Sequence, residues 1–149
     1  MVDPATFAVD GCEGVSFISP STNLRCGITK PDGSSSELLW GCRAEEYNWE
    51  FSKSQPSDYC YGSEIRCGNG IEALGNEMPH PWQHSDPGIP AGLANVPGQY
   101  GEFDVATLHY GEGISYGGVT CLSEEVHMTC FNATSGHGFV ISRDENTIY

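Results

Sequence analysis

Two imidazoles and a thioether lie within seven residues near the middle of the chain, at Met78, His80 and His84. Ligands of this softness are typical of copper or zinc sites, so the segment is a candidate for metal chemistry. The two histidines would share a face only on a helix, and the prolines on either side of His80 disfavour a helix there. The alternative is a proline-stiffened surface loop in which Trp82 is packed, and on that reading we expect no metal or other cofactor.

His137 is a second candidate because it stands between two glycines. Such a bend could present the imidazole as a general base or as a ligand. A tight turn leading into a strand at Phe139 explains the same residues. Ser142 and Asp144 follow closely, but a catalytic triad is defined by spatial geometry, which closeness in the sequence does not show.

Seven cysteines are spread along the chain rather than gathered into the close pairs of a zinc ribbon. They are Cys12, Cys26, Cys42, Cys60, Cys67, Cys121 and Cys130. This distribution favours a disulfide framework, which forms in oxidising compartments outside the cytoplasm. Because seven is odd, three bridges would leave one thiol over, and Cys12 and Cys67 are the least certain to pair.

Alternating apolar residues predict the strands that must carry the first of these cysteines, over residues 15–17, 24–28 and 38–42. Lys30–Gly33 is a turn signal, with proline and glycine at characteristic positions. A tight turn there would place Cys26 opposite Leu38. A wider loop centred on Ser34 would place Cys26 opposite Cys42, and a direct bridge requires this second register.

Short strands return in the last third of the chain and predict an antiparallel meander from Phe103 to Ile141. Cys121 and Cys130 have eight residues between them, which is an even number. A two- or four-residue loop around Glu124–Glu125 would therefore place them directly opposite each other on paired strands. We predict a cross-strand disulfide between them.

Between residues 43 and 101 the alternation is lost among proline, glycine, serine and asparagine, and we expect a long ordered loop region. At most a short helical turn is expected near Glu45 or Ile71. Cys60 and Cys67 could tie this region down. Its aromatic residues are candidates for exposed binding contacts, above all Trp49, Trp82 and Tyr100.

Together these patterns predict a single disulfide-stabilised domain over residues 1–149, mainly all-β. The expected architecture is a small antiparallel β-sandwich or a partly open barrel with a long ordered loop region. A formal net charge of −14 argues against nucleic acid as a partner and favours solubility. We find no apolar run long enough for a membrane span. The opening residues lack the features of a signal peptide, so we expect a mature domain behind an added start codon.

Two stretches resemble a known group of proteins. Phe17–Cys26, which reads Phe-Ile-Ser-Pro-Ser-Thr-Asn-Leu-Arg-Cys, is similar to the opening of small secreted or lipid-anchored actinobacterial domains of unknown function. Gly118–Cys121, Thr129–Asn132 and Gly136–Arg143 resemble the ending of the same domains. The resemblance implies an exported, disulfide-bonded β fold, and it transfers no catalytic residue.

The hypothesis that follows is a secreted or cell-envelope binding module without catalytic activity, whose partner is a protein or a glycan of the envelope. One alternative is a small extracellular enzyme or metal-binding protein that uses His137 or the loop of His80 and His84. A further alternative is a protease inhibitor that presents a disulfide-rigid loop. The sequence leaves the oligomeric state open.

Overall fold

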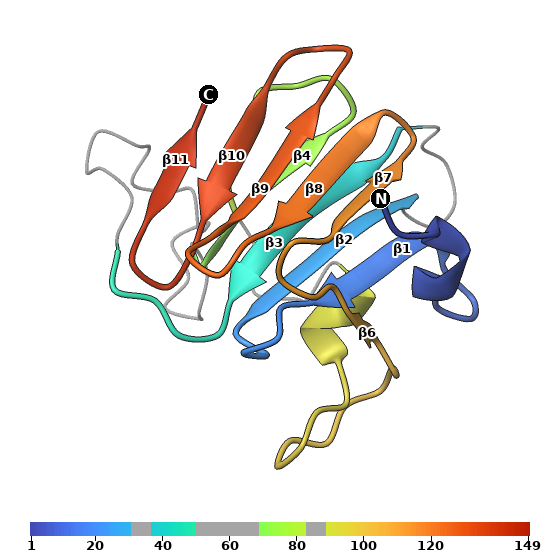
Figure 1. Ribbon diagram of the computed structural model, residues 1–149. Helices are drawn as coiled ribbons and strands as arrows, with labels where there is room; N and C mark the ends of the chain where they lie inside the picture. The colour runs from blue at the N-terminus through green and yellow to red at the C-terminus, as the bar shows by residue number, and fades with distance from the viewer. Residues whose placement is uncertain (31–36, 50–68, 83–88) are drawn as a thin grey trace, which may run out of the picture.

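Two β-sheets lie against each other in the computed structural model, which describes residues 1–30, 37–49, 69–82 and 89–149 (Figure 1). The first sheet has the strand order β5-β4-β3-β2-β1-β6. Its strands are β1 (Glu13–Ile18), β2 (Leu24–Lys30), β3 (Leu39–Ala44), β4 (Gly70–Leu74), β5 (His80–Pro81) and β6 (Ala106–Thr107). Both sheets are open, which confirms the predicted class of a mainly β sandwich or partly open barrel.

The second sheet is an antiparallel meander with the order β11-β10-β9-β8-β7. It contains β7 (Gly113–Tyr116), β8 (Val119–Ser123), β9 (Met128–Asn132), β10 (Gly138–Ile141) and β11 (Asn146–Ile148). Two short 3-10 helices complete the described elements, η1 (Pro4–Phe7) and η2 (Pro90–Leu93). No helix within the described ranges has the length and apolar character needed to cross a membrane.

The main core fills the space between the two sheets and is built by alternation along the strands. Every second residue of β2 and β3 points inward, which buries Leu24, Cys26, Ile28, Trp40, Cys42 and Ala44. The facing side chains come from the second sheet and include Cys121, Met128, Cys130, Phe139 and Ile141. The period of two that predicts these strands therefore also identifies the face that is buried.

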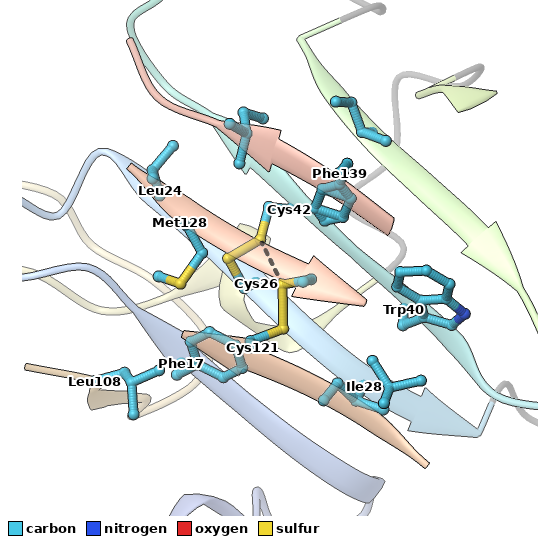
Figure 2. Close-up of a cluster of buried hydrophobic side chains, with 14 of the residues drawn as sticks. Phe17, Leu24, Cys26, Ile28, Trp40, Cys42, Leu108, Cys121, Met128 and Phe139 are labelled. Atoms are coloured by element: carbon cyan, nitrogen blue, oxygen red, sulfur yellow. Dashed lines mark hydrogen bonds between the residues drawn. A yellow bond between two sulfur atoms is a disulfide. The ribbon is translucent and has the colours of Figure 1, made fainter. Parts of the chain in front are cut away.

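Two disulfides lie at the centre of this core. Cys26 pairs with Cys42 across β2 and β3, and Cys121 pairs with Cys130 across β8 and β9. Figure 2 shows their sulfur atoms together, and the Sγ atoms of Cys42 and Cys130 are 3.9 Å apart. Neither sulfur carries a hydrogen, so this is a van der Waals contact, and it joins the two sheets through their bridges.

The bridge between Cys121 and Cys130 forms as the spacing predicts, with a four-residue turn between Ser123 and Met128. In the first hairpin the register pairs Cys26 with Cys42. The register of a tight turn, with Cys26 opposite Leu38, is therefore wrong, and the alternative register that a direct bridge requires is correct. Cys60 and Cys67 lie outside the described residues, and Cys12 is the free cysteine among those described.

A second hydrophobic cluster covers the outer face of the first sheet. It joins Ile18 to Trp82 and to Ile89, Ala91, Ala94 and Val96 from the segment around η2. Gly27 allows this approach, because a Cβ at that position would lie 3.1 Å from the Cγ2 atom of Ile89. As a result β2 is buried on both faces, and polar residues that point away from the main core are buried too.

Two expectations about chain regions need correction. Within the region expected to be loop, Gly70–Leu74 forms β4 and pairs with β3, so Ile71 lies in a strand and not in a helical turn. Near Phe103 the chain does not join the antiparallel meander, because β6 pairs in parallel with β1 of the first sheet. Both strands are short, and their partners lie far away in the sequence, so local periodicity could not reveal them.

Candidate functional site

Several turns from both sheets gather at one end of the sandwich, which we call the loop end. They are the β1–β2 turn (19–23), the segment after β3 (45–49), the β8–β9 turn (124–127) and the β10–β11 turn (142–145). In Figure 1 these connections lie at the lower left. Antiparallel pairing brings alternate turns of each sheet to the same end, and the packing of the sheets then places them side by side.

The β1–β2 turn separates two pockets at the loop end. Ser21 and Asn23 line both of them. The pocket toward the second sheet, here called the His127 pocket, has a volume of about 220 Å³. The pocket toward the first sheet, here called the Arg25 pocket, also measures about 220 Å³. The Ser-Pro-Ser-Thr-Asn motif therefore forms the ridge between two hollows.

An imidazole between two acidic turns marks the His127 pocket. The Nδ1 atom of His127 is 3.3 Å from the Oε1 atom of Glu145, and its Nε2 atom is 3.8 Å from the Oε1 atom of Glu124. Apolar surface lies beside these charges, since Val126 is 68% exposed and Tyr110 is 45% exposed. The pocket therefore offers acidic, hydroxyl and apolar surface together.

The serine hydroxyls of this pocket are committed to the backbone and do not form a nucleophile–base pair with His127. The Oγ atom of Ser142 accepts hydrogen bonds from two backbone N–H groups of its own turn, at 3.1 Å each. The hydroxyl of Ser123 donates to the backbone oxygen of Leu108 at 3.0 Å. Among the described residues no serine lies within hydrogen-bond distance of an imidazole, so the geometry of a hydrolytic triad is not assembled there.

A clasp between the two sheets fixes the rim of the His127 pocket. Asn48 donates its backbone N–H to the oxygen of Arg143 at 2.8 Å and its side-chain N–H to the Oδ1 atom of Asp144 at 2.6 Å. The indole of Trp49 donates to the oxygen of Ser142 at 2.7 Å, and its ring packs against Tyr47. Trp49 is only 8% exposed, so it anchors the segment after β3 instead of presenting its ring to solvent.

We expect the carboxyl group of Asp144 to titrate below its ordinary pKa of 3.8, because the Asn48 amide and then the Arg143 guanidinium stabilise its charged form. A pKa lowered in the folded state stabilises the fold at pH values above 3.8, and this contribution disappears as the pH falls through the lowered value. Carboxyl-carbon NMR titration measures the midpoint. Asn48→Ala should raise it more than Arg143→Gln does, whereas a wild-type midpoint at or above the ordinary value would contradict the assignment.

The Arg25 pocket contains a buried guanidinium. Arg25 is 2% exposed, and its Nε atom donates to the backbone oxygen of Thr22 at 2.6 Å. Its Nη2 atom is 3.4 Å from the Oε1 atom of Gln99, which is a long hydrogen bond. Its Nη1 atom is buried and has no hydrogen-bond partner among the described residues.

The backbone around Arg25 is held in an unusual conformation. Thr22 has a φ of 66°, the one positive φ among the described non-glycine residues. Asn23 locks the turn in place, because its side chain donates to the oxygen of Glu46 at 2.9 Å and accepts from the Glu46 N–H at 2.6 Å. The strained turn is thus fixed by hydrogen bonds to the segment after β3, which is a common arrangement at binding sites.

The histidines that the sequence proposes as metal ligands or as a base do not converge. The Nε2 atom of His80 is 3.3 Å from the Oε1 atom of Glu77, and its Nδ1 atom is 2.9 Å from the oxygen of Pro81. His84 lies outside the described residues. The backbone of His137 closes its turn through Asn132. Within the part of the chain that the structure describes, no group of three or more His, Cys, Asp or Glu side chains could hold a metal ion.

The expected aromatic contact surface is corrected by burial. Trp82 is fully buried in the second cluster, where the guanidinium of Arg43 lies 5.5 Å from its ring centre. Trp49 is buried in the clasp. Tyr100, in contrast, is 93% exposed. Of the three predicted contact residues, Tyr100 is therefore the one whose ring is available to a partner in this structure.

Sequence reasoning missed Arg25 and His127. The alternation of β2 does give one signal, because Arg25 stands between the core residues Leu24 and Cys26 and must point to the opposite face. That face would normally be solvated, and nothing local indicates that the segment around η2 covers it. The carboxylates beside His127 come from two separate hairpins, so their convergence has no sequence signature.

No family model, curated protein or solved structure matches the chain. The resemblance to small actinobacterial exported domains therefore stays a prediction.

Proposed function

We propose that the chain is a secreted or cell-envelope binding module without catalytic activity, which engages a protein or a glycan of the envelope through its loop end. The observation that carries this proposal is the pair of adjoining pockets at the loop end. They offer the exposed side chains of Tyr110 and Val126 together with carboxylates, on turns that the rest of the fold holds in place.

The fixed conformation of the loop-end turns supports a binding role. The turns of the loop end are joined by hydrogen bonds between the sheets, so a partner would meet a preformed surface and little ordering entropy would oppose association. The buried disulfides behind these turns strengthen the same scaffold. Stable bridges of this kind also favour an oxidising location outside the cytoplasm.

The net charge of the chain limits the classes of partner that it can bind. With a formal net charge of −14, a strongly anionic polymer would be repelled, whereas basic or neutral surfaces would not. At the His127 pocket the acidic turns stand beside the exposed side chains of Val126 and Tyr110. Mixed surfaces of this kind are typical of the rim and core of recognition sites.

A matched pair of tyrosine variants tests the proposal. Tyr110 and Tyr149 are both 45% exposed, but Tyr110 lines the His127 pocket whereas Tyr149 follows β11 at the opposite end of the sandwich. We expect purified protein to co-sediment with washed envelope material of the producing organism. Tyr110→Ala combined with Val126→Ser should weaken this association about tenfold or more, since exposed anchors contribute most of a binding free energy.

Tyr149→Ala serves as the control and should leave the association unchanged. Envelope material stripped of protein by hot detergent separates the two partner classes, because only a glycan partner survives that treatment. Equal retention of the wild type and of the loop-end double variant on both materials would refute the proposal. The enzyme, metal and protease-inhibitor alternatives gain no specific support from the described residues.

A further inference from the structure

We propose that the Arg25 pocket is a subsite for one ring of a neutral saccharide, with Tyr100 as the stacking surface beside it. This inference rests on the proposed function, because it names the ligand class for one part of the same loop end. It goes further in assigning the buried guanidinium as a hydrogen-bond donor to the ligand.

One hydrogen-bond donor of the buried Arg25 guanidinium is unsatisfied. Arg25 is 2% exposed, and its Nη1 atom has no hydrogen-bond partner among the described residues. A buried charged donor without an acceptor is strongly unfavourable, so such groups are normally paired with protein, water or ligand. The long contact of 3.4 Å to the exposed Gln99 side chain is weak and easily displaced. A ligand oxygen that displaced the Gln99 side chain would give the guanidinium a better acceptor.

The acidic surroundings of the pocket disfavour an anionic ligand. Glu45 and Glu46 line the same pocket, and the whole chain is strongly acidic. A carboxylate or phosphate that approached Arg25 would also approach these side chains and would be repelled. A sugar hydroxyl avoids this conflict, because it accepts a hydrogen bond from the guanidinium while it or its neighbour donates to a carboxylate. The mixture of donors and acceptors therefore fits a neutral polyol.

The residue next to the pocket in the sequence is an exposed aromatic residue, Tyr100. It directly follows Gln99, which lines the pocket, and 93% of its surface is exposed. The turn before it is fixed, since Val96 and Gln99 exchange backbone hydrogen bonds of 3.2 and 3.0 Å, and Gly98 supplies the required φ of +83°. An exposed tyrosine ring presents an apolar face and a hydroxyl edge, which together match the C–H face and hydroxyl groups of a pyranose.

The size of the pocket limits what it can hold. Its volume of about 220 Å³ is below the range of roughly 300–1,000 Å³ that is usual for drug-sized ligands. One sugar ring is a suitable occupant, and the remainder of an oligosaccharide would extend over the surface. Asn23 and the β1–β2 turn then separate this subsite from the His127 pocket.

The probe for the experiment is a panel of neutral di- to tetrasaccharides built from glucose, mannose, galactose and N-acetylglucosamine. Titration of the isotope-labelled full chain by NMR should shift the signals of Gln99, Tyr100 and the Arg25 Nε–H group. Tyr100→Ala should lower the affinity for the best ligand about three- to tenfold, which corresponds to the free energy of one aromatic contact. Tyr149→Ala, which alters a tyrosine at the opposite end, should leave its affinity unchanged.

Glu46→Gln distinguishes a sugar from an anion, and it avoids the risk that a variant of buried Arg25 fails to fold. Removal of this charge should lower the affinity for a neutral saccharide severalfold, because one charged acceptor is lost. The same change would raise the affinity for an anion. Sodium acetate and glucuronate are the anionic probes. The affinity of the sugar should also change little between low and high salt.

The inference is overturned if no saccharide shifts the signals of Gln99 and Tyr100, or if acetate or glucuronate binds there instead. Either result leaves the proposed function standing when Tyr110→Ala with Val126→Ser still reduces association with envelope material. The proposed function fails separately when that association is absent or insensitive to the double variant.

Discussion

Removal of both described disulfides is expected to unfold the protein or to leave it marginally stable. The chain-entropy model assigns about 3 kcal/mol to each bridge, given that the partners are separated by 16 residues in one case and 9 in the other. Because a domain of this size is stable by only about 5–15 kcal/mol, the loss of both bridges is comparable to the whole margin.

The comparison needs three variants, each measured by urea denaturation. Cys26→Ala with Cys42→Ala removes the first bridge, Cys121→Ala with Cys130→Ala removes the second, and the quadruple variant removes both. The two bridges touch through the 3.9 Å contact of Cys42 and Cys130, so their effects should not simply add. Substitution isolates these bridges better than reduction, which would act on every disulfide of the chain.

Cys12→Ala is the internal control, because Cys12 carries no bridge and is only partly buried. We expect its denaturation midpoint to stay close to that of the wild type. A quadruple variant with the stability of the wild type would show that the sheets hold together without covalent help. In that case the disulfides would no longer support an oxidising location.

Trp40→Ala is expected to lower the free energy of unfolding by about 3–5 kcal/mol, the cost of truncating a large aromatic side chain in a core. Trp40 is fully buried and stacks on Phe139 of the second sheet, with ring centres 5.9 Å apart. Its ring therefore joins the two sheets, and its removal would leave a cavity between them.

Trp40→Phe separates the packing of this side chain from its hydrogen bond. The indole donates to the backbone oxygen of Gly75 at 2.9 Å, and the side chain of Asn132 donates to the same oxygen at 3.0 Å. Because that oxygen keeps one partner, we expect Trp40→Phe to cost much less than Trp40→Ala, about 1–2 kcal/mol. Urea denaturation measures both, with Tyr100→Ala as an exposed control that should change little. Equal destabilisation by Ala and Phe would contradict the assigned role of the ring.

The residues that test stability and the residues that test binding lie in different parts of the molecule. The bridges and Trp40 lie in the main core, whereas Tyr110, Tyr100 and Glu46 are exposed. Variants of the exposed group should change binding without a comparable loss of stability. This separation allows a failure of binding to be interpreted as a failure of recognition rather than of folding.

At the loop end, local sequence does not predict the contacts between separate turns. The adjacent acids at 124–125 and 144–145 occupy exposed turns. Their sequence positions do not show that they surround one imidazole from two hairpins. In the same way, the Ser-Pro-Ser-Thr-Asn motif was identified by resemblance, while its place between two pockets depends on the packing of both sheets.

The sequence by itself determined the all-β class, the inward-facing residues of the long strands and the bridge between Cys121 and Cys130. These features depend on local rules, because alternation sets the buried face of a strand and an even loop length sets the register of a short hairpin. The tertiary structure alone decided the pairing of Cys26 with Cys42 and the parallel pairing of β6 with β1. It also decided the burial of Trp82 and Arg25 under the segment around η2. Each of these depends on contacts between segments far apart in the sequence, whose free energy is a property of the packed molecule and not of any local stretch.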